Sequence, residues 1–225
     1  MTLNVCIPTL NRNEKLTNCI ESIQKAKKDL SVTVSICFSD LEELKYFNIL
    51  YKDIPWIHCL STLYEKASTF WNRQLYFLEE DALLYLNDDV LLFEDSLENI
   101  FSAYQTAFPN YDGVLGINQA NIPDNQSIKC AFGVIGTRFA NLFPQRKVFC
   151  PVYYRFFLDE ELYLYVKKTN KFAFSLDAKI LHLHPSFGGE KDSTHTAVRT
   201  YWRQDFKNFT KRRDNNLLWG ETWEI

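Results

Sequence analysis

Over the first ninety residues, short apolar runs alternate with longer segments in which apolar side chains recur every three or four positions. Short apolar runs are typical of buried strands, whereas the longer spacing places apolar side chains on one face of a helix. Residues 12–28 end in a lysine-rich stretch, which suits a helix C-terminus. The pattern predicts strands at 3–7, 32–38, 57–60 and 82–86 and helices at 12–28, 40–50 and 64–80.

This alternation of strands and helices predicts an α/β protein with a mostly parallel sheet covered by helices on both faces. Ligands of such sheets bind beyond the carboxyl ends of the strands, so the residues that follow each strand are of most interest. They are Pro8 and Thr9 after the first strand, Ser39 and Asp40 after the second, and Asn87, Asp88 and Asp89 after the fourth.

Beyond residue 110 the pattern is less regular. The expected helix 158–168 is followed by Asn170, which tolerates the left-handed conformation that ends many helices. Residues 185–196 are polar and contain two adjacent glycines, so we expect a mobile loop there. The remaining expected elements are strands at 114–117, 129–135, 172–176 and 179–184 and a short helix at 137–142.

The sharpest chemical signal is the segment LLYLNDDVLLF, residues 83–93. Carboxylates between two apolar runs are costly to bury unless a partner compensates their charge. A hard divalent cation is a natural partner, because Mg²⁺ binds one or two carboxylates and completes its shell with substrate phosphates and water. Such a cation would neutralise a diphosphate leaving group. Asn-Asp-Asp is also good turn chemistry, so a turn with a helix cap is the alternative.

Three blocks of the sequence resemble inverting family 2 glycosyltransferases of the GT-A fold. The blocks are VCIPTLNR at residues 5–12, WNRQLYFLEEDALLYLNDDV at 71–90 and FLDEELYLYVKKTNKFAFSLDAKILHLH at 157–184. They occur in the family's order, and the resemblance covers residues 3–184. It implies a Rossmann-like, mixed and mostly parallel sheet sandwiched by helices. The GT-A domain would span 1–184, with a nucleotide-binding half at 1–90 and an acceptor-side half at 91–184; residues 185–225 would add a flexible loop and a basic, aromatic helical extension.

The resemblance implies a binding site for a nucleotide-diphosphate sugar, with uridine diphosphate as the expected nucleotide. Asn87 departs from the family by replacing the first Asp of the D-x-D motif. Asp40 would hold the base or the ribose, or cap a helix, and Arg73 would reach the nucleotide or lie on a helix surface. The implied donor-binding residues are Pro8, Thr9, Asn11, Arg12, Asp40, Asn72, Arg73, Asn87 and Asp88.

By the same resemblance, Asp89 is the first candidate ligand for Mn²⁺ or Mg²⁺, and a histidine completes the protein's share of the metal shell. His182 and His184 lie on one face of the expected strand, because side chains alternate with period two. The family position favours His184. Taken alone, the H-x-H pair also fits a zinc half-site or two packed histidines.

An inverting transfer needs a general base that takes the proton of the acceptor hydroxyl. The distance to the expected helix stop makes Asp159 the candidate base, with Glu160 in reserve. An acidic helix start that complements the helix dipole is the alternative interpretation of this D-E-E run.

The C-terminal segment 196–213 combines aromatic and basic positions at helical spacing. One expected ridge consists of Arg199, Arg203, Lys207 and Lys211. Such a ridge can dock DNA, an anionic membrane surface or the donor diphosphate, or it can be a solvated helix face. Residues 182–206 also resemble small phage-encoded members of the family, which implies a hydroxymethylated pyrimidine in phage DNA as the acceptor. A saccharide is the other acceptor that we expect.

Composition narrows the classes further. The net charge of −3 excludes a generally basic nucleic-acid coat, and the six cysteines contain no C-x-x-C pair. There is no G-x-G-x-x-G motif, which excludes a dinucleotide dehydrogenase. Without a long apolar stretch or a signal-like N-terminus, we expect a cytoplasmic protein, in the host cytoplasm if phage-encoded. The prediction is a hexosyl- or pentosyltransferase, and the alternative is an inactive nucleotide-sugar-binding module of the same fold.

Overall fold

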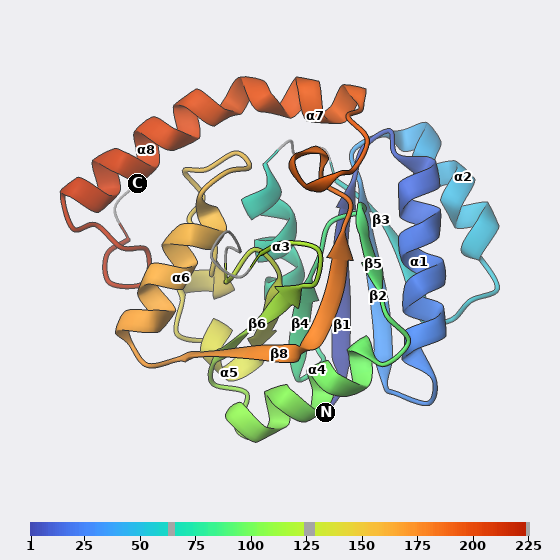
Figure 1. Cartoon of the computed structure of the whole chain (residues 1–225), viewed down its shortest axis with the longest axis horizontal. Helices are drawn as coiled ribbons and strands as arrows, with labels where there is room; N and C mark the ends of the chain where they lie inside the picture. The colour runs from blue at the N-terminus through green and yellow to red at the C-terminus, as the bar shows by residue number, and fades with distance from the viewer. Residues whose placement is uncertain (63–65, 124–128, 224–225) are drawn as a thin grey trace.

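The computed structural model describes residues 1–62, 66–123 and 129–223. It contains one eight-stranded mixed sheet with helices on both faces (Figure 1). The strands are β1 (Leu3–Thr9), β2 (Val32–Phe38), β3 (Ile57–Ser61), β4 (Ala82–Tyr85), β5 (Val90–Leu92), β6 (Val114–Gln119), β7 (Gly133–Gly136) and β8 (Phe172–His182). The helices are α1 (Asn13–Lys27), α2 (Leu41–Tyr51), α3 (Ala67–Phe77), α4 (Ser96–Ala107), α5 (Thr137–Ala140), α6 (Leu158–Lys168), α7 (Ser193–Val198) and α8 (Trp202–Asp214).

The strand order is β3-β2-β1-β4-β7-β6-β8-β5. Strand β1 pairs in parallel with β2 and β4, and β2 pairs in parallel with β3. Strand β7 is antiparallel to both β4 and β6, whereas β8 is parallel to β6 and antiparallel to β5. The parallel half ends its strands on one side, where Asn87 to Asp89 follow β4 next to the end of β1.

Two hydrophobic layers follow from the alternation of side chains along the strands. Val5 and Ile7 of β1 point into the layer that contains the apolar faces of α1 and α4. Cys6, between them, points into the opposite layer, which contains apolar residues of α3, α5 and α6. The cysteine therefore serves as a small core residue, and all six cysteines are unpaired.

Most of the predicted elements are present, but several regions differ. Strand β5 was not predicted, because a three-residue strand has no period of its own and β5 exists by pairing with β8. Helix α4 was not predicted either. The two expected strands at 172–176 and 179–184 form one strand, β8, whose pairing with β6 skips from Ser175 to Lys179 in a β-bulge-like irregularity. The strand expected at 129–135 is shorter, and residues 64–65 of an expected helix lie outside the described residues.

The C-terminal part of the chain wraps over one end of the sheet. In Figure 1, α7 and α8 form an arc along the top of the molecule, from the side of α1 to the side of α6. Residues 185–196 were expected to form a loop, but Pro185–Phe187 form a 3₁₀ turn and Ser193 begins α7. Within the described ranges, no helix is both long and apolar enough to cross a membrane.

Candidate active site

The ends of β1 and β4 bring the acidic pair against a buried arginine. Thr9 donates a hydrogen bond from Oγ1 to Asp88 Oδ2 at 2.9 Å. Arg12 Nη1 lies 2.8 Å from Asp88 Oδ1 and 3.4 Å from Asp89 Oδ2. All three charged side chains are buried, so the guanidinium compensates part of the carboxylate charge inside the protein.

The ends of β6 and β8 place a histidine opposite Asp89. His182 Nδ1 lies 2.8 Å from Gln119 Oε1, which can only accept, so Nδ1 carries the proton. In the neutral imidazole, Nε2 therefore presents a lone pair. This atom lies 3.5 Å from Asp89 Oδ1, and both atoms are buried without a hydrogen-bond partner in the described chain.

A third group of site residues comes from α7 and was not predicted. Asp192 caps α7 and approaches Arg12 Nε at 3.0 Å and Lys15 Nζ at 2.6 Å. His195 Nε2 lies 3.7 Å from Asp89 Oδ2. The sequence Asp-Ser-Thr-His at residues 192–195 could have indicated a helix cap at Asp192. The neighbouring sequence does not indicate that this helix lies against Arg12.

The electrostatic environment separates the pKa values of these groups. Burial alone raises the pKa of Asp89, but His182, Arg12 and His195 outweigh it and lower the pKa to about 2. Burial lowers the pKa of His184 to about 4, with a contribution from neighbouring His182. Asp89 is therefore ionised and His184 neutral at neutral pH.

A pocket of about 360 Å³ lies at the acidic pair and is lined by Asp89. Carboxylate and histidine side chains line it together with aromatic rings and the start of α6. Its residues include Arg12, Trp71, Asn87, Asp89, Gln119, Arg155, Phe157, Asp159, Glu160, His182, His184, His195 and Trp202.

Asp159 and Glu160, at the start of α6, are the two carboxyl residues of this helix that line the pocket. Burial, and then the charge of Glu160, raise the pKa of Asp159 to about 7. Burial also raises the pKa of Glu160. A carboxyl with a pKa near neutrality is suited to accept a proton from a hydroxyl at physiological pH.

Of the residues predicted from sequence, the structure brings the following to the pocket: Arg12, Asn87, Asp89, Asp159, Glu160, His182 and His184. Thr9 and Asp88 lie directly behind them. His184 lines the pocket, but its Nδ1 accepts a hydrogen bond from the backbone of Ser186. Between the two predicted histidines, His182 is the one placed against Asp89.

Asn72 makes two hydrogen bonds that were not predicted. Its Nδ2 donates to the carbonyl of Phe149 at 2.7 Å, and its Oδ1 accepts from the Phe149 N–H at 2.9 Å. Through these two bonds Asn72 anchors the segment before α6, and its contact with a nucleotide stays a prediction. Pro8 is buried within β1, opposite Cys37 of β2.

Three further predicted donor residues make contacts of their own. Asp40 accepts hydrogen bonds from the first turn of α2, as its alternative interpretation as a helix cap predicted. Asn11 donates its backbone N–H to Glu43, and Arg73 donates to the carbonyl of Ser61. None of these residues is among the described residues that line the pocket.

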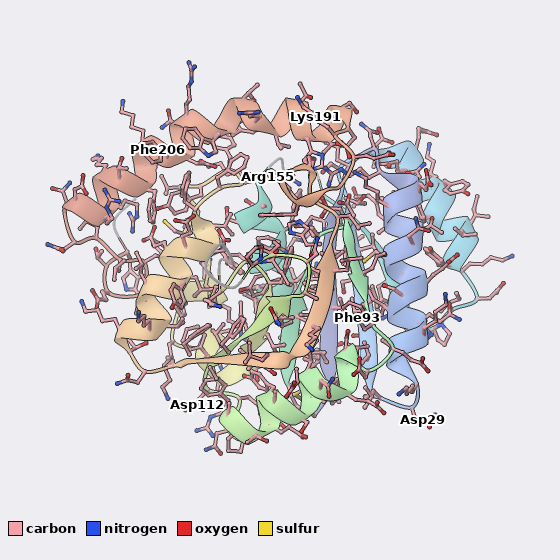
Figure 2. The ribbon with its side chains drawn as sticks, viewed as in Figure 1. Asp29, Phe93, Asp112, Arg155, Lys191 and Phe206 are labelled. Carbon is pink, nitrogen blue, oxygen red and sulfur yellow. The ribbon has the colours of Figure 1, made fainter. Side chains whose placement is uncertain are left out.

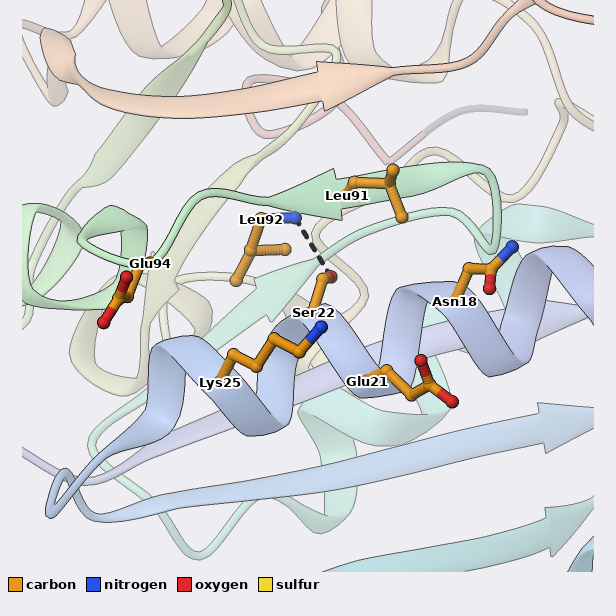
Figure 3. Close-up of a pocket in the computed structure, with 7 residues that line it drawn as sticks. All are labelled: Asn18, Glu21, Ser22, Lys25, Leu91, Leu92 and Glu94. Carbon is orange, nitrogen blue, oxygen red and sulfur yellow. Dashed lines mark hydrogen bonds between the residues drawn. The ribbon is translucent and has the colours of Figure 1, made fainter.

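A second hollow, of about 610 Å³, lies between α1 and β5 (Figure 3). Leu92 donates its backbone N–H to Ser22 Oγ at 3.0 Å and so ties the strand to the helix. The lining residues include Lys25, Glu21 and Glu94, and they contain none of the predicted site residues. We therefore assign the candidate active site to the pocket at the acidic pair.

A scan against models of known protein families and a search of curated protein sequences each found no match. Among solved structures, the chain is similar to the mannosyltransferase PcManGT from Pyrobaculum calidifontis, in complex with GDP-Man and Mn²⁺. The TM-score is 0.68 at 12% identity, over 97% of this chain and 68% of that chain. It is also similar to S. aureus TarS, with a TM-score of 0.62 at 12% identity, over 94% of this chain and 43% of that chain.

Residues 1–349 of S. aureus TarS, in complex with UDP, match with a TM-score of 0.57 at 12% identity. That match covers 80% of this chain, which spans 59% of the TarS fragment. Together with the mixed sheet and its flanking helices, these likenesses identify a GT-A-like glycosyltransferase fold. The predicted fold class is confirmed.

The chemistry of the site fits a divalent cation that is held only in part by protein. Among the described residues, no group of three or more His, Cys, Asp or Glu side chains could hold a metal ion by itself. Asp89 Oδ1 and His182 Nε2 nevertheless face each other at 3.5 Å with no hydrogen bond. Two neighbouring ligands of an octahedral Mg²⁺, each at about 2.1 Å, lie roughly 3 Å apart. A cation could therefore bind between these atoms with only a small adjustment.

Proposed function

We propose that this protein is a metal-dependent glycosyltransferase that moves a sugar from a UDP-sugar to an acceptor hydroxyl with inversion. The observation that carries the proposal is the unsatisfied pair of Asp89 Oδ1 and His182 Nε2 in the same pocket as Asp159. The fold supports it, because similar structures contain GDP-Man with Mn²⁺ and UDP.

In this proposal Asp89 and His182 hold Mn²⁺ or Mg²⁺, whose charge would neutralise the diphosphate when the cation is bound. Gln119 fixes the His182 ring by accepting from Nδ1, which leaves Nε2 free as the ligand atom. Thr9 and Arg12 hold Asp88 in place behind Asp89. His184, which the family resemblance favours, is the competing ligand.

Asp159 is the proposed general base. The carboxyl lies in the pocket with the acidic pair, and its raised pKa lets it accept the acceptor's proton near neutral pH. Phe157, which precedes α6 in a left-handed conformation with φ of 67°, sets the direction in which the helix begins. Inversion follows if the activated hydroxyl attacks the sugar from the face opposite the diphosphate.

The surface beside the pocket has exposed aromatic rings and a basic ridge, which suit an anionic acceptor. We propose a hydroxymethylated pyrimidine in DNA as this acceptor. A saccharide is the alternative. Trp202 lines the pocket and stacks on Phe206, with ring centroids 5.0 Å apart and an interplanar angle of 7°. Each of these rings is 42% exposed, so they can stack on a base or a sugar ring. The basic ridge consists of Arg199, Arg203, Lys207 and Lys211, all exposed and without an ion pair to a described residue.

The first test is a calorimetric titration of UDP-sugars with and without Mn²⁺. We expect binding that depends on Mn²⁺ and is lost in Asp89→Asn, because this variant removes the charge on the proposed ligand. His182→Ala should weaken metal-dependent binding more than His184→Ala does. Binding that is unchanged in Asp89→Asn would remove the metal assignment, and a larger effect of His184→Ala would transfer the ligand role to that residue.

Turnover is measured in the same samples with candidate acceptors, including DNA that contains hydroxymethylated pyrimidine. Product formation with inverted configuration at the sugar C1 is the expected result. Metal-dependent donor binding without donor hydrolysis or transfer would instead identify a nucleotide-sugar-binding module of the same fold.

If the basic ridge binds DNA, affinity should fall steeply as salt rises, because bound cations are released from the phosphates. Replacing Arg203 and Lys207 together by Gln should lower the slope of log K against log salt by about 1.8 on duplex DNA, or about 0.9 for each charge. Fluorescence anisotropy from about 50 to 200 mM salt measures this slope. A flat response, or no binding, would mean that the ridge is a solvated helix face.

A further inference from the structure

Arg155 is a cation in the pocket that makes no ion pair with a described carboxylate. It lines the pocket together with Arg12, Asp89 and Asp159, and its guanidinium makes no hydrogen bond or ion pair with any described residue. Burial lowers the pKa of Arg155, and the charges of Asp88 and Asp89 offset this only in part, so the pocket contains a partly desolvated guanidinium. Figure 2 shows Arg155 beneath the arc of α7 and α8, toward the sheet.

The other cations near the acidic pair are already paired with protein carboxylates. Arg12 contacts Asp88 and Asp89 and also Asp192, and Lys15 contacts the same Asp192 carboxylate at 2.6 Å. An incoming anion would have to compete with these ion pairs. Of the described arginine and lysine residues that line the pocket, Arg155 is the one that makes no ion pair with a described carboxylate.

The backbone that carries Arg155 is held by a buried carboxylate of α8. Asp205 is fully buried, and its Oδ1 accepts from the Tyr154 N–H at 2.9 Å. Its Oδ2 accepts from the N–H groups of Arg155 at 2.8 Å and Phe156 at 2.9 Å. Tyr154 also stacks on Tyr201, with centroids 4.6 Å apart and rings within 2° of parallel. Three bonds to one carboxylate fix this loop to the C-terminal helix.

We propose that Arg155 binds the diphosphate of the nucleotide-sugar donor, and that Asp205 is the positioning residue that holds Arg155 in the pocket. The proposal rests on the proposed function, since it assigns part of the donor site. A guanidinium matches phosphate oxygens with paired N–H donors, and a diphosphate next to Asp88 and Asp89 needs positive charge beyond the already paired Arg12.

The same contact serves the chemical step. As the acceptor oxygen bonds to the sugar C1, the bond from C1 to the diphosphate oxygen breaks with its electron pair on that oxygen. The acceptor proton passes to Asp159, and nucleoside diphosphate leaves. The guanidinium of Arg155 stabilises the charge that develops on the leaving diphosphate, so its role is larger in the transition state than in the bound donor.

The test is calorimetric binding of UDP, GDP and inorganic pyrophosphate in the presence of Mn²⁺. Arg155→Gln should weaken whichever of these ligands the native protein binds by about 10- to 100-fold, because a charge-assisted hydrogen bond is lost. Arg155→Lys keeps the charge but not the paired donors, so its affinity for the ligand should lie between those of the native protein and Arg155→Gln. Arg138→Gln, an exposed arginine on α5, is the matched control and should bind as the native protein does. Circular dichroism confirms that each variant is folded.

Asp205→Asn tests the positioning role. The amide can accept on one side only, so the loop loses part of its anchor and binding of the same diphosphate ligands should weaken. In the double variant with Arg155→Gln, the second change should add no further loss, because Asp205 acts through Arg155. If Asp205 had a purely structural role, Asp205→Asn would weaken binding by the same factor in the Arg155→Gln background as in the native protein.

The outcomes separate this inference from the proposed function. Diphosphate binding that is equal in the native protein and Arg155→Gln would overturn the role of Arg155 and leave the glycosyltransferase proposal intact. Additive losses in the double variant would overturn the role of Asp205. A native protein that binds none of the three ligands with Mn²⁺ would overturn the proposed function and this inference together.

Discussion

Replacing Asp159 by Asn should lower the rate of sugar transfer by about 10²- to 10⁴-fold, the usual contribution of a general base. The change keeps the size of the side chain and removes its ability to take a proton. Donor binding should be preserved, because the proposed metal ligands Asp89 and His182 and the proposed diphosphate-binding residue Arg155 are unchanged. The measurement is kcat for transfer, with donor affinity from calorimetry in parallel.

The pH profile provides an independent check on the same residue. The pKa of Asp159 is raised to about 7, and the base works only when ionised, so kcat should rise about tenfold per pH unit below 7 and level off above it. This rise should disappear in Asp159→Asn. Asp214→Asn, which changes an exposed carboxylate on α8, is the matched control. Normal turnover and an unchanged profile in Asp159→Asn would move the base to another group, with Glu160 the next to test.

Replacing Arg212 by Met should lower the free energy of unfolding by about 3–5 kcal/mol, because it leaves the buried carboxylate of Glu161 without its charged partner. Glu161 accepts from Arg212 Nη2 at 3.0 Å, from the backbone of Trp219 at 2.7 Å and from the hydroxyl of Tyr153. Both charged side chains are buried. Tm should fall by about 6–20 °C in a domain of this size.

Arg213→Met is the matched control for this prediction. Arg213 pairs with Asp214 at 3.0 Å, but both side chains are largely exposed, so the loss should stay below about 1 kcal/mol. Urea denaturation of both variants provides the comparison. Equal, small effects of the two substitutions would show that the contact between Glu161 and Arg212 contributes little to the attachment of α8 to α6.

Much of the local structure was predictable because it depends on neighbours in the chain. Strand β2 and helix α6 have the predicted bounds, and Asn170 is left-handed with φ of 55°. Their apolar periodicity and end signals need no distant partner. Asp89 was also predictable, because the sequence shows an acidic pair directly after a buried strand. Burying these charges costs free energy unless a partner compensates them.

The residues that surround Asp89 were less predictable. Asp192 and His195 reach Arg12 across a sequence separation of 180 residues or more, through a helix that was expected to be a loop. Asn72 fits a donor-binding motif in sequence, yet its amide is used by the backbone of Phe149. Glu161 resembled an ordinary acidic helix start until Arg212 supplied its partner.

For this protein, the sequence by itself determined the α/β alternation, the positions of the acidic pair and of Asp159, and the basic face of the C-terminal helix. Only the tertiary structure decided which polar groups are already satisfied and which are left open. Arg12 is paired with Asp88, whereas Arg155 makes no ion pair with a described residue. His182, rather than His184, lies against Asp89. The physical reason is that the compensation of a buried charge depends on atoms within a few ångströms, whatever their separation along the chain.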